Sequence, residues 1–282
     1  MRWQGSRKSS NVQDYRGRGL GGRAGLGIGG TLIALIGAYF LGVDPRVLMG
    51  VMESVPATGQ QEVAPGVPQD EQGQFMAAVL GDTEDTWTAL FAKAGMRYTP
   101  ATLVLFSDQV RTGCGIGSAG AGPFYCPADS KVYIDLSFYD ELKTQFQAPG
   151  DFAQAYVLAH EVGHHVQNLL GTADKVRAAQ QRGGSEQAAN QMQVRMELQA
   201  DCFAGVWAHN ANRSRQILEQ GDVEEALGAA SAVGDDTIQK RTQGHVVPES
   251  FTHGTAQQRK EWFNRGLANG TIETCDTFSA SL

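Results

Sequence analysis

The chain has little positive charge, and most of what it has lies at one end. Its 282 residues contain 23 Lys and Arg against 30 Asp and Glu, a formal net charge of −7. Residues 1–23 carry six basic residues and one acidic residue, a net +5, which leaves −12 for the rest of the chain. A nucleic-acid-binding domain needs a basic patch or stripe. The sequence therefore predicts no nucleic-acid partner.

Residues 24–43 contain no charged side chain at all. As a helix, these twenty residues would extend about 30 Å, the hydrocarbon thickness of a bilayer. We predict one transmembrane helix over 24–43, because the alternative, a cleaved signal peptide, lacks a small-x-small site after the apolar run. Basic residues precede the run and acidic residues follow it, which places residues 1–23 in the cytoplasm. The expected location is the cell inner membrane, with the bulk of the chain periplasmic or extracytoplasmic.

Cysteines are few, and no two of them have the C-x-x-C spacing of common structural zinc sites. All four follow the apolar run, so they would meet an oxidising compartment. Four cysteines allow three disulfide pairings. We favour Cys114 with Cys126, which closes a short loop, and that choice leaves Cys202 with Cys275.

No internal repeat of about 20 to 50 residues is visible, so a repeat architecture is not expected. Residues 44–74 are rich in Pro, Gly and Gln and have little apolar content, which predicts a linker. The folded domain is expected over 75–282, with helical packing that breaks at Gly81 and ends at Gly95. Residues 102–106 form an apolar run rich in β-formers and predict a buried strand.

The glycine-rich stretch between Gly113 and Gly122 contains a G-x-G-x-x-G pattern, but the helix that a dinucleotide site requires does not follow it. Residues 131–138 alternate apolar and polar side chains, which predicts a half-exposed strand. A strand just before a ligand-bearing helix could lie beside a cleft and pair with an extended peptide.

The most informative sequence is His160-Glu161-Val162-Gly163-His164-His165, which contains HExxH. Its helix is predicted from an N-cap at Asp151 to a stop at Gly171. On a helix, His160 and His164 share one face, so both imidazoles can bind one zinc ion. Glu161 is offset around the helix, which lets its carboxylate act as general base toward a water molecule.

Catalytic zinc takes three protein ligands, so a third must come from elsewhere. The positions at which metzincins carry glycine and histidine hold Gln167 and Leu170, which excludes that class. A helix predicted over 185–210 contains Glu197 and Asp201 four residues apart. Glu197 is favoured over Glu186 as third ligand, since Asp201 can then accept a hydrogen bond from the second nitrogen of a ligand histidine.

Two further histidines are candidates for other roles. His165 points about 100° away from His164 on the helix, so it should pack or meet solvent rather than bind zinc. His253 could stabilise the oxyanion of a tetrahedral intermediate. A structural hydrogen bond from a loop histidine is an equally good interpretation of His253.

With these residues assembled, the chain resembles the bacterial family of neutral zinc metallopeptidases with a single N-terminal membrane span. The resemblance covers nearly the whole length: 1–3, 9–12, 122–127, the HEVGHH helix, 197–202 and 251–259. It implies a zincin-like α+β domain, with a small sheet and active-site helices, behind one transmembrane helix. The E-x-x-x-D pair of Glu197 and Asp201 resembles that of gluzincins.

The expected function is therefore a membrane-anchored zinc metalloendopeptidase. Zn²⁺ would be held by His160, His164 and Glu197, with Glu161 as general base, and the partners would be a peptide or protein substrate and a membrane. Two alternatives remain open. One is a catalytically silent, membrane-tethered binding module in which zinc only organises the fold, and the other is a scaffold without metal.

Overall fold

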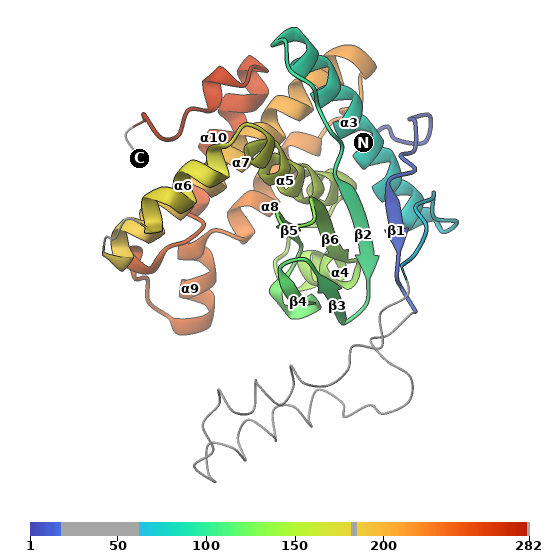
Figure 1. Cartoon of the computed structure of the whole chain (residues 1–282). Helices are drawn as coiled ribbons and strands as arrows, with labels where there is room; N and C mark the ends of the chain where they lie inside the picture. The colour runs from blue at the N-terminus through green and yellow to red at the C-terminus, as the bar shows by residue number, and fades with distance from the viewer. Residues whose placement is uncertain (18–61, 182–184, 281–282) are drawn as a thin grey trace.

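The computed structural model describes residues 1–17, 62–181 and 185–280, in which most of the helices lie to one side of a small sheet (Figure 1). Four strands form the sheet, in the order β1 (Val12–Asp14), β2 (Thr102–Phe106), β6 (Lys131–Asp135) and β5 (Phe124–Cys126). The first three run parallel to one another and β5 runs antiparallel to β6. A separate antiparallel pair consists of β3 (Gln109–Thr112) and β4 (Gly115–Ser118). The mixed α+β class is thus confirmed.

Eight α-helices make up most of the remaining described chain: α3 (Glu71–Lys93), α4 (Ser137–Thr144), α5 (Asp151–Leu169), α6 (Thr172–Gln181), α7 (Glu186–Arg215), α8 (Asp222–Ala232), α9 (Asp235–Gln243) and α10 (Ala256–Asn269). Three short 3₁₀ turns accompany them: η1 (Ala119–Ala121), η2 (Pro248–Ser250) and η3 (Glu273–Cys275). The main apolar core lies where α3, α5, α7, α8 and α10 pack together and against one face of the sheet.

The two helices predicted to carry the site form with small differences at their ends. α5 begins at Asp151, with Gly150 rather than Asp151 as its N-cap. It stops before Gly171, which has the φ of +74° that a glycine stop requires. α7 begins after Ser185, whose side chain caps it, and continues to Arg215, beyond the predicted end.

The N-terminal residues belong to the same folded unit as the helices, which differs from the predicted division of the chain. β1 extends the sheet beside β2, and the backbone N–H of Ser9 donates to the carbonyl of Ala77 in α3 at 2.8 Å. The segment predicted to stand apart, 1–23, therefore packs on the domain over residues 1–17. The predicted linker, 44–74, includes the first residues of α3.

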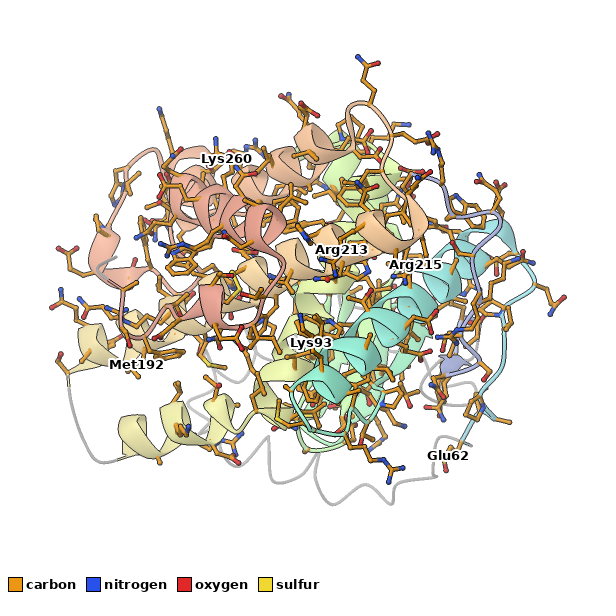
Figure 2. All side chains as sticks on the ribbon, turned by 90° about the horizontal axis from the view of Figure 1, so that it is seen from above. Glu62, Lys93, Met192, Arg213, Arg215 and Lys260 are labelled. Atoms are coloured by element: carbon orange, nitrogen blue, oxygen red, sulfur yellow. A yellow bond between two sulfur atoms is a disulfide. The ribbon has the colours of Figure 1, made fainter. Side chains whose placement is uncertain are left out.

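α3 is continuous across Gly81, where we expected a break. A Cβ at Gly81 would lie 2.6 Å from the carbonyl oxygen of Arg7, so glycine is needed there for the close approach of the N-terminal segment. The neighbouring Asp82 is buried and accepts two hydrogen bonds from Arg215, which joins α3 to the end of α7 (Figure 2). The predicted end at Gly95 is confirmed by its φ of +72°.

The strand predicted over 131–138 is shorter and more deeply buried than expected. β6 ends at Asp135, whose carboxylate accepts the backbone N–H of Ser137 at 3.0 Å where α4 begins. Tyr133, expected to face solvent, is 2% exposed because β6 lies between two strands and a second apolar cluster that includes Tyr15 and Phe106 covers that face. β6 is therefore an inner strand, and the edge strands of this sheet are β1 and β5.

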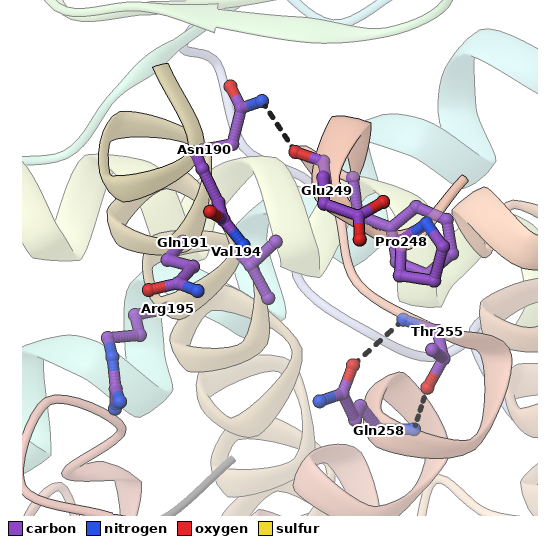
Figure 3. A pocket seen from close by; sticks show the side chains of 10 residues that line it. Asn190, Gln191, Val194, Arg195, Pro248, Glu249, Thr255 and Gln258 are labelled. Atoms are coloured by element: carbon purple, nitrogen blue, oxygen red, sulfur yellow. Dashed lines mark hydrogen bonds between the residues drawn. The ribbon is translucent and has the colours of Figure 1, made fainter. Parts of the chain in front are cut away.

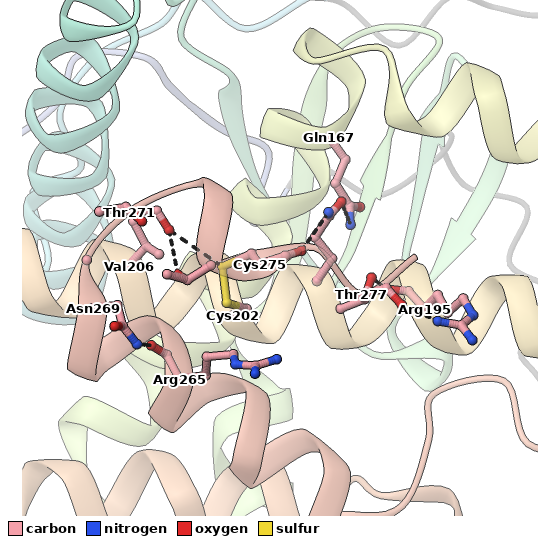
Figure 4. Close-up of a disulfide and its surroundings, with 12 residues drawn as sticks. Gln167, Arg195, Cys202, Val206, Arg265, Asn269, Thr271, Cys275 and Thr277 are labelled. Atoms are coloured by element: carbon pink, nitrogen blue, oxygen red, sulfur yellow. Dashed lines mark hydrogen bonds between the residues drawn. A yellow bond between two sulfur atoms is a disulfide. The ribbon is translucent and has the colours of Figure 1, made fainter. Parts of the chain in front are cut away.

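Both favoured disulfide pairings are confirmed. Cys114 is bonded to Cys126, and Cys202 is bonded to Cys275. The second disulfide joins α7 to η3 near the C-terminal end of the described chain (Figure 4). The glycine-rich stretch forms β4, η1 and the approach to β5, so no helix follows its G-x-G-x-x-G pattern, as expected.

The predicted membrane helix over 24–43 lies outside the described residues. Within the described ranges, no helix is both long and apolar enough to span a bilayer. A single crossing by 24–43 would put residues 1–17 and the domain on opposite sides of a membrane. That topology and the pairing of β1 with β2 cannot hold in the same molecule.

Candidate metal centre

The candidate metal centre lies where α5 and α7 approach each other closely. α5 carries His160, Glu161 and His164, and α7 carries Glu197. Gly163 makes the close approach possible, because a Cβ there would lie 3.0 Å from the carbonyl oxygen of Ala200. The helices can therefore place side chains from both into one small volume.

The two predicted imidazoles converge on one carboxylate oxygen. Nε2 of His160 lies 3.2 Å from Oε2 of Glu197, and Nε2 of His164 lies 3.4 Å from it. A tetrahedral zinc site with bonds of about 2.0–2.1 Å separates its ligand atoms by about 3.3 Å. The donor set and its spacing therefore fit zinc. Glu186, the alternative third ligand, is exposed at the start of α7, away from this group.

The second ring nitrogen of each histidine is held by an acceptor. Nδ1 of His160 lies 2.8 Å from Oδ1 of Asp201, as predicted, and Nδ1 of His164 lies 2.9 Å from Oε1 of Gln167. Carboxylate and amide oxygens can only accept, so each Nδ1 carries a hydrogen, and Nε2 is the ring nitrogen that binds a metal ion once it loses its proton. Gln167 is fully buried and donates to the carbonyl of Met196 at 2.7 Å. Our sequence reasoning used Gln167 only to exclude metzincins and missed this role.

Asp201 is in turn paired with a buried cation from α10. Nε and Nη2 of Arg259 donate to its two oxygens at 2.8 and 2.9 Å, and the hydroxyl of Tyr156 donates to Oδ1 at 2.5 Å. Burial raises the pKa of Asp201, but Arg259 and His160 outweigh that effect and bring it to about 2. Neither Arg259 nor Tyr156 was predicted, although Arg259 ends the sequence segment 251–259 that carried part of the resemblance.

The charges around the histidines favour a cation between two carboxylates. Burial lowers the pKa of His160, but Asp201 and Glu197 raise it to about 10. Burial also opposes ionisation of Glu197, yet the two histidines bring its pKa well below the ordinary value. The site is thus built to stabilise positive charge at the point where the two Nε2 atoms meet, which agrees with a metal site.

Glu161 is 8% exposed and lines the same cavity as His160 and His164. Burial raises its pKa above the ordinary value, against the opposing influence of the two histidines. Its position beside the three candidate ligands, but outside their group, agrees with the predicted division between base and ligands.

His253 lies between α9 and α10 and also lines this cavity. Its Nδ1 is 3.1 Å from Oδ1 of Asp235, and a hydrogen bond to Asp235 raises its pKa. The other oxygen of Asp235 accepts the backbone N–H groups of Thr252, His253 and Gly254 at 2.7, 2.6 and 3.0 Å. Asp235 therefore fixes both the backbone and the ring of His253. No sequence signal linked these two positions.

The segment that carries His253 is anchored at both ends. On one side, Nδ2 of Asn190 in α7 donates to the carbonyl of Glu249 at 3.1 Å. On the other, Thr255 and Gln258 form a capping box that starts α10. These side chains line a separate cavity of about 480 Å³ (Figure 3).

His165, which follows the second candidate ligand, is buried and turned away from the metal centre. Its Nε2 lies 2.7 Å from the carbonyl oxygen of Thr99, and its Nδ1 lies 3.0 Å from the hydroxyl of Tyr125. Burial lowers the pKa of His165. The expectation that it does not join the ligand group agrees with this placement.

The metal centre opens into a cavity of about 660 Å³, within the range of about 300–1,000 Å³ that ligand pockets occupy. One side consists of residues 120–125, which include the start of β5. The cavity lining also contains apolar side chains, most of them half-buried: Phe138, Phe146, Val157 and Ile238. An apolar cavity with a few convergent polar groups is typical of a substrate site.

Comparison with known families agrees with this geometry. The model of the family described as "Putative neutral zinc metallopeptidase" matches residues 1–278. The chain belongs to this family. It is 51% identical to "Uncharacterized protein YpfJ" of Escherichia coli strain K12, with all of both chains covered. It is 44% identical to "Uncharacterized protein Mb2605" of Mycobacterium bovis, over 86% of each chain.

"Uncharacterized protein Rv2575" of Mycobacterium tuberculosis is also 44% identical, over 86% of each chain. No solved structure matches the chain. The description of the family names zinc and peptidase activity, and the geometry of the site is compatible with both.

Proposed function

We propose that this protein is a zinc-dependent peptidase that hydrolyses peptide bonds in the cavity beside α5. One observation carries the proposal. Two imidazole Nε2 atoms, each with its Nδ1 held by an acceptor, converge on one oxygen of Glu197, and a buried Glu161 stands beside them in the same cavity.

His160, His164 and Glu197 would hold the zinc ion. When bound, zinc supplies Lewis acidity, which lowers the pKa of water toward about 7 and polarises a carbonyl group. Asp201 and Gln167 keep the two rings in the tautomer that presents Nε2. Nε2 of Gln193 donates to the second oxygen of Glu197 at 2.8 Å and keeps the first oxygen turned toward the histidines.

Glu161 acts as general base and then as general acid. Its carboxylate takes a proton from the attacking water as the new C–O bond forms, and later delivers that proton to the amine as the C–N bond breaks. His253, held by Asp235, donates a hydrogen bond to the carbonyl oxygen as negative charge develops there.

A peptide substrate would lie extended between α5 and the edge of the sheet. Within the described chain, β5 pairs with β6 on one side only, so its other edge has backbone groups free for an added strand. Residues 120–125 line the cavity on that side, and apolar side chains such as Phe138 and Ile238 also line it. Peptides and unfolded protein segments have the extended shape that this arrangement can bind.

The decisive experiment compares the full chain with its Glu161→Gln variant, since residues 1–17 contribute to the fold. We expect one zinc per chain in both proteins and cleavage of a peptide library by the wild type only. Glu141→Gln is the matched control, because Glu141 lines the same cavity from α4 without being in the candidate ligand group. Cleavage by Glu161→Gln at the wild-type rate would exclude the proposed base.

A zinc-stabilised binding module is the second candidate function, and the apolar part of the cavity lining is the observation that favours it. It predicts stoichiometric zinc, peptide binding, and no cleavage by wild type or variant. For location, we propose that the uncharged run 24–43 associates the protein with a membrane. The packing of residues 1–17 on the domain requires both to lie on one side of it.

A further inference from the structure

The last histidine of the HEVGHH sequence, His165, makes two hydrogen bonds whose directions can be assigned. Nε2 of His165 lies 2.7 Å from the carbonyl oxygen of Thr99, which can only accept, so Nε2 carries a hydrogen. In a neutral ring Nδ1 then accepts, and the hydroxyl of Tyr125, 3.0 Å away, donates to it. A charged ring would donate from both nitrogens and leave the hydroxyl hydrogen of Tyr125 without this acceptor.

The hydroxyl of Tyr125 makes a second hydrogen bond. Nδ2 of Asn168 donates to it at 3.1 Å, so the hydroxyl accepts one hydrogen bond and donates another. His165 and Asn168 are three residues apart and share one face of α5. The rings of Tyr98 and Tyr125 both pack edge-on against His165, with centroids 5.8 and 5.4 Å from it. The last turns of α5 thus hydrogen-bond to and pack against one side chain of β5, that of Tyr125.

These contacts involve β5, the strand that borders the proposed substrate cavity. β5 has only three residues and pairs with β6 on one side. Tyr125 lines the cavity with its neighbours, while His165 follows directly after His164 on α5. The contacts of Tyr125 therefore set the position of β5, one border of the cavity, relative to the helix that carries the candidate ligands.

We propose that His165, Tyr125 and Asn168 form a tether that fixes β5 against the HExxH helix and so aligns the peptide substrate with the metal centre. This role rests on the proposed peptidase function. His165 and Tyr125 are then positioning residues, which do not touch the reacting atoms. Alignment matters because a misplacement of about 1 Å can cost about 100-fold in rate.

Tyr125→Phe tests the tether with the smallest change available. It removes one oxygen and keeps the ring that packs on His165. Tyr133→Phe is the matched control, because it removes a tyrosine hydroxyl from the adjacent strand β6, where the hydroxyl donates to Asp129 and lies outside the cavity lining. His165→Gln removes the tether from the other end.

Hydrogen exchange measures the tether without reference to catalysis. We expect backbone amides of β5 to exchange faster in Tyr125→Phe and His165→Gln by about tenfold, the effect of losing one hydrogen bond, and to be unchanged in Tyr133→Phe. The double variant should exchange no faster than either single variant, because both break the same link. Unchanged exchange in Tyr125→Phe would overturn the tether.

Kinetics then measures alignment. kcat/KM for a peptide that spans the cavity should fall about tenfold in Tyr125→Phe and His165→Gln, mainly through kcat, because a misaligned peptide reacts more slowly once it is bound; zinc content should be unchanged. Faster exchange with an unchanged kcat would reduce the cluster to a structural contact and overturn the alignment role. If the wild type cleaves no peptide, both the proposed function and the alignment role are refuted. The hydrogen-exchange result would still show whether the tether between β5 and α5 exists.

Discussion

The buried ion pair behind His160 allows a quantitative test of how the centre is built. Arg259 is 3% exposed and Asp201 is fully buried, and they share two hydrogen bonds of 2.8 and 2.9 Å. Removing one partner of such a pair leaves a charge without compensation and costs about 3–5 kcal/mol, whereas replacing both partners by neutral groups costs far less. Arg259→Met and Asp201→Asn should therefore each destabilise the protein by about 3–5 kcal/mol.

The double variant distinguishes the effect of the two charges on stability from the effect of side-chain shape. With Asp201→Asn and Arg259→Met combined, no charge remains from the pair, so the loss should fall short of the sum of the single losses by at least about 2 kcal/mol. The comparison pair is Arg215 with Asp82, where the arginine side chain is 31% exposed. Arg215→Met should cost less, about 1–2 kcal/mol, because water can reach the carboxylate that remains.

Urea unfolding of the oxidised full chain, followed by tryptophan fluorescence, measures these free energies. The series should be run with excess zinc and again with a chelator, because Asp201 also holds His160 and its loss should weaken zinc binding by about 10–100-fold. The ion-pair energy should be similar in both conditions. Additive losses in the double variant, or a loss below about 1 kcal/mol for Arg259→Met, would refute the reasoning.

Two further predictions concern pH and topology. The hydrogen bond to Asp235 raises the pKa of His253, so the cationic ring is lost only as pH rises through that raised value. Asp235→Asn should therefore move the alkaline limb of the kcat/KM profile to lower pH. Asp236→Asn is the control, because Asp236 accepts the backbone N–H of Ala256 instead, and this variant should leave the alkaline limb in place. Single cysteines introduced at the exposed Gln4 and Lys93 should react alike with a membrane-impermeant maleimide in intact cells, and opposite labelling would show that β1 does not pair with β2 in the cell.

The parts of the site that depend on local spacing could be predicted from the sequence. His160 with His164, and Glu197 with Asp201, are four residues apart on helices, so a shared face follows from helix geometry alone. Both helices and both disulfides were also predictable. The prediction that β6 is half-exposed was wrong. Alternation of apolar and polar residues cannot show that a second apolar cluster covers the polar face of the strand.

The contacts that the sequence did not predict join residues far apart in the chain. Arg259 reaches Asp201 because α10 lies directly on α7, where a Cβ at Gly266 would be 2.0 Å from the carbonyl oxygen of Cys202. A glycine in an ordinary helical stretch, such as Gly266, indicates such contact only once the partner helix is known. Asp235 and His253 meet through one hydrogen bond from the His253 backbone N–H and one between the two side chains, and no spacing in the sequence marks either contact.

Gly163 shows why the spacing of HExxH needs a particular residue between its fixed positions. The motif supplies two histidines from one helix, so the remaining condition for a three-ligand site is the distance from α5 to Glu197 on α7. That distance is set where Gly163 contacts Ala200, three residues beyond Glu197, and a Cβ there would lie 3.0 Å from the Ala200 oxygen. A side chain at 163 would require the facing backbone of α7 to shift by a few tenths of an ångström, close to the 3.2 and 3.4 Å separations on which the proposed ligand geometry depends. The glycine between the histidines is therefore part of the candidate metal centre, together with the proposed ligands.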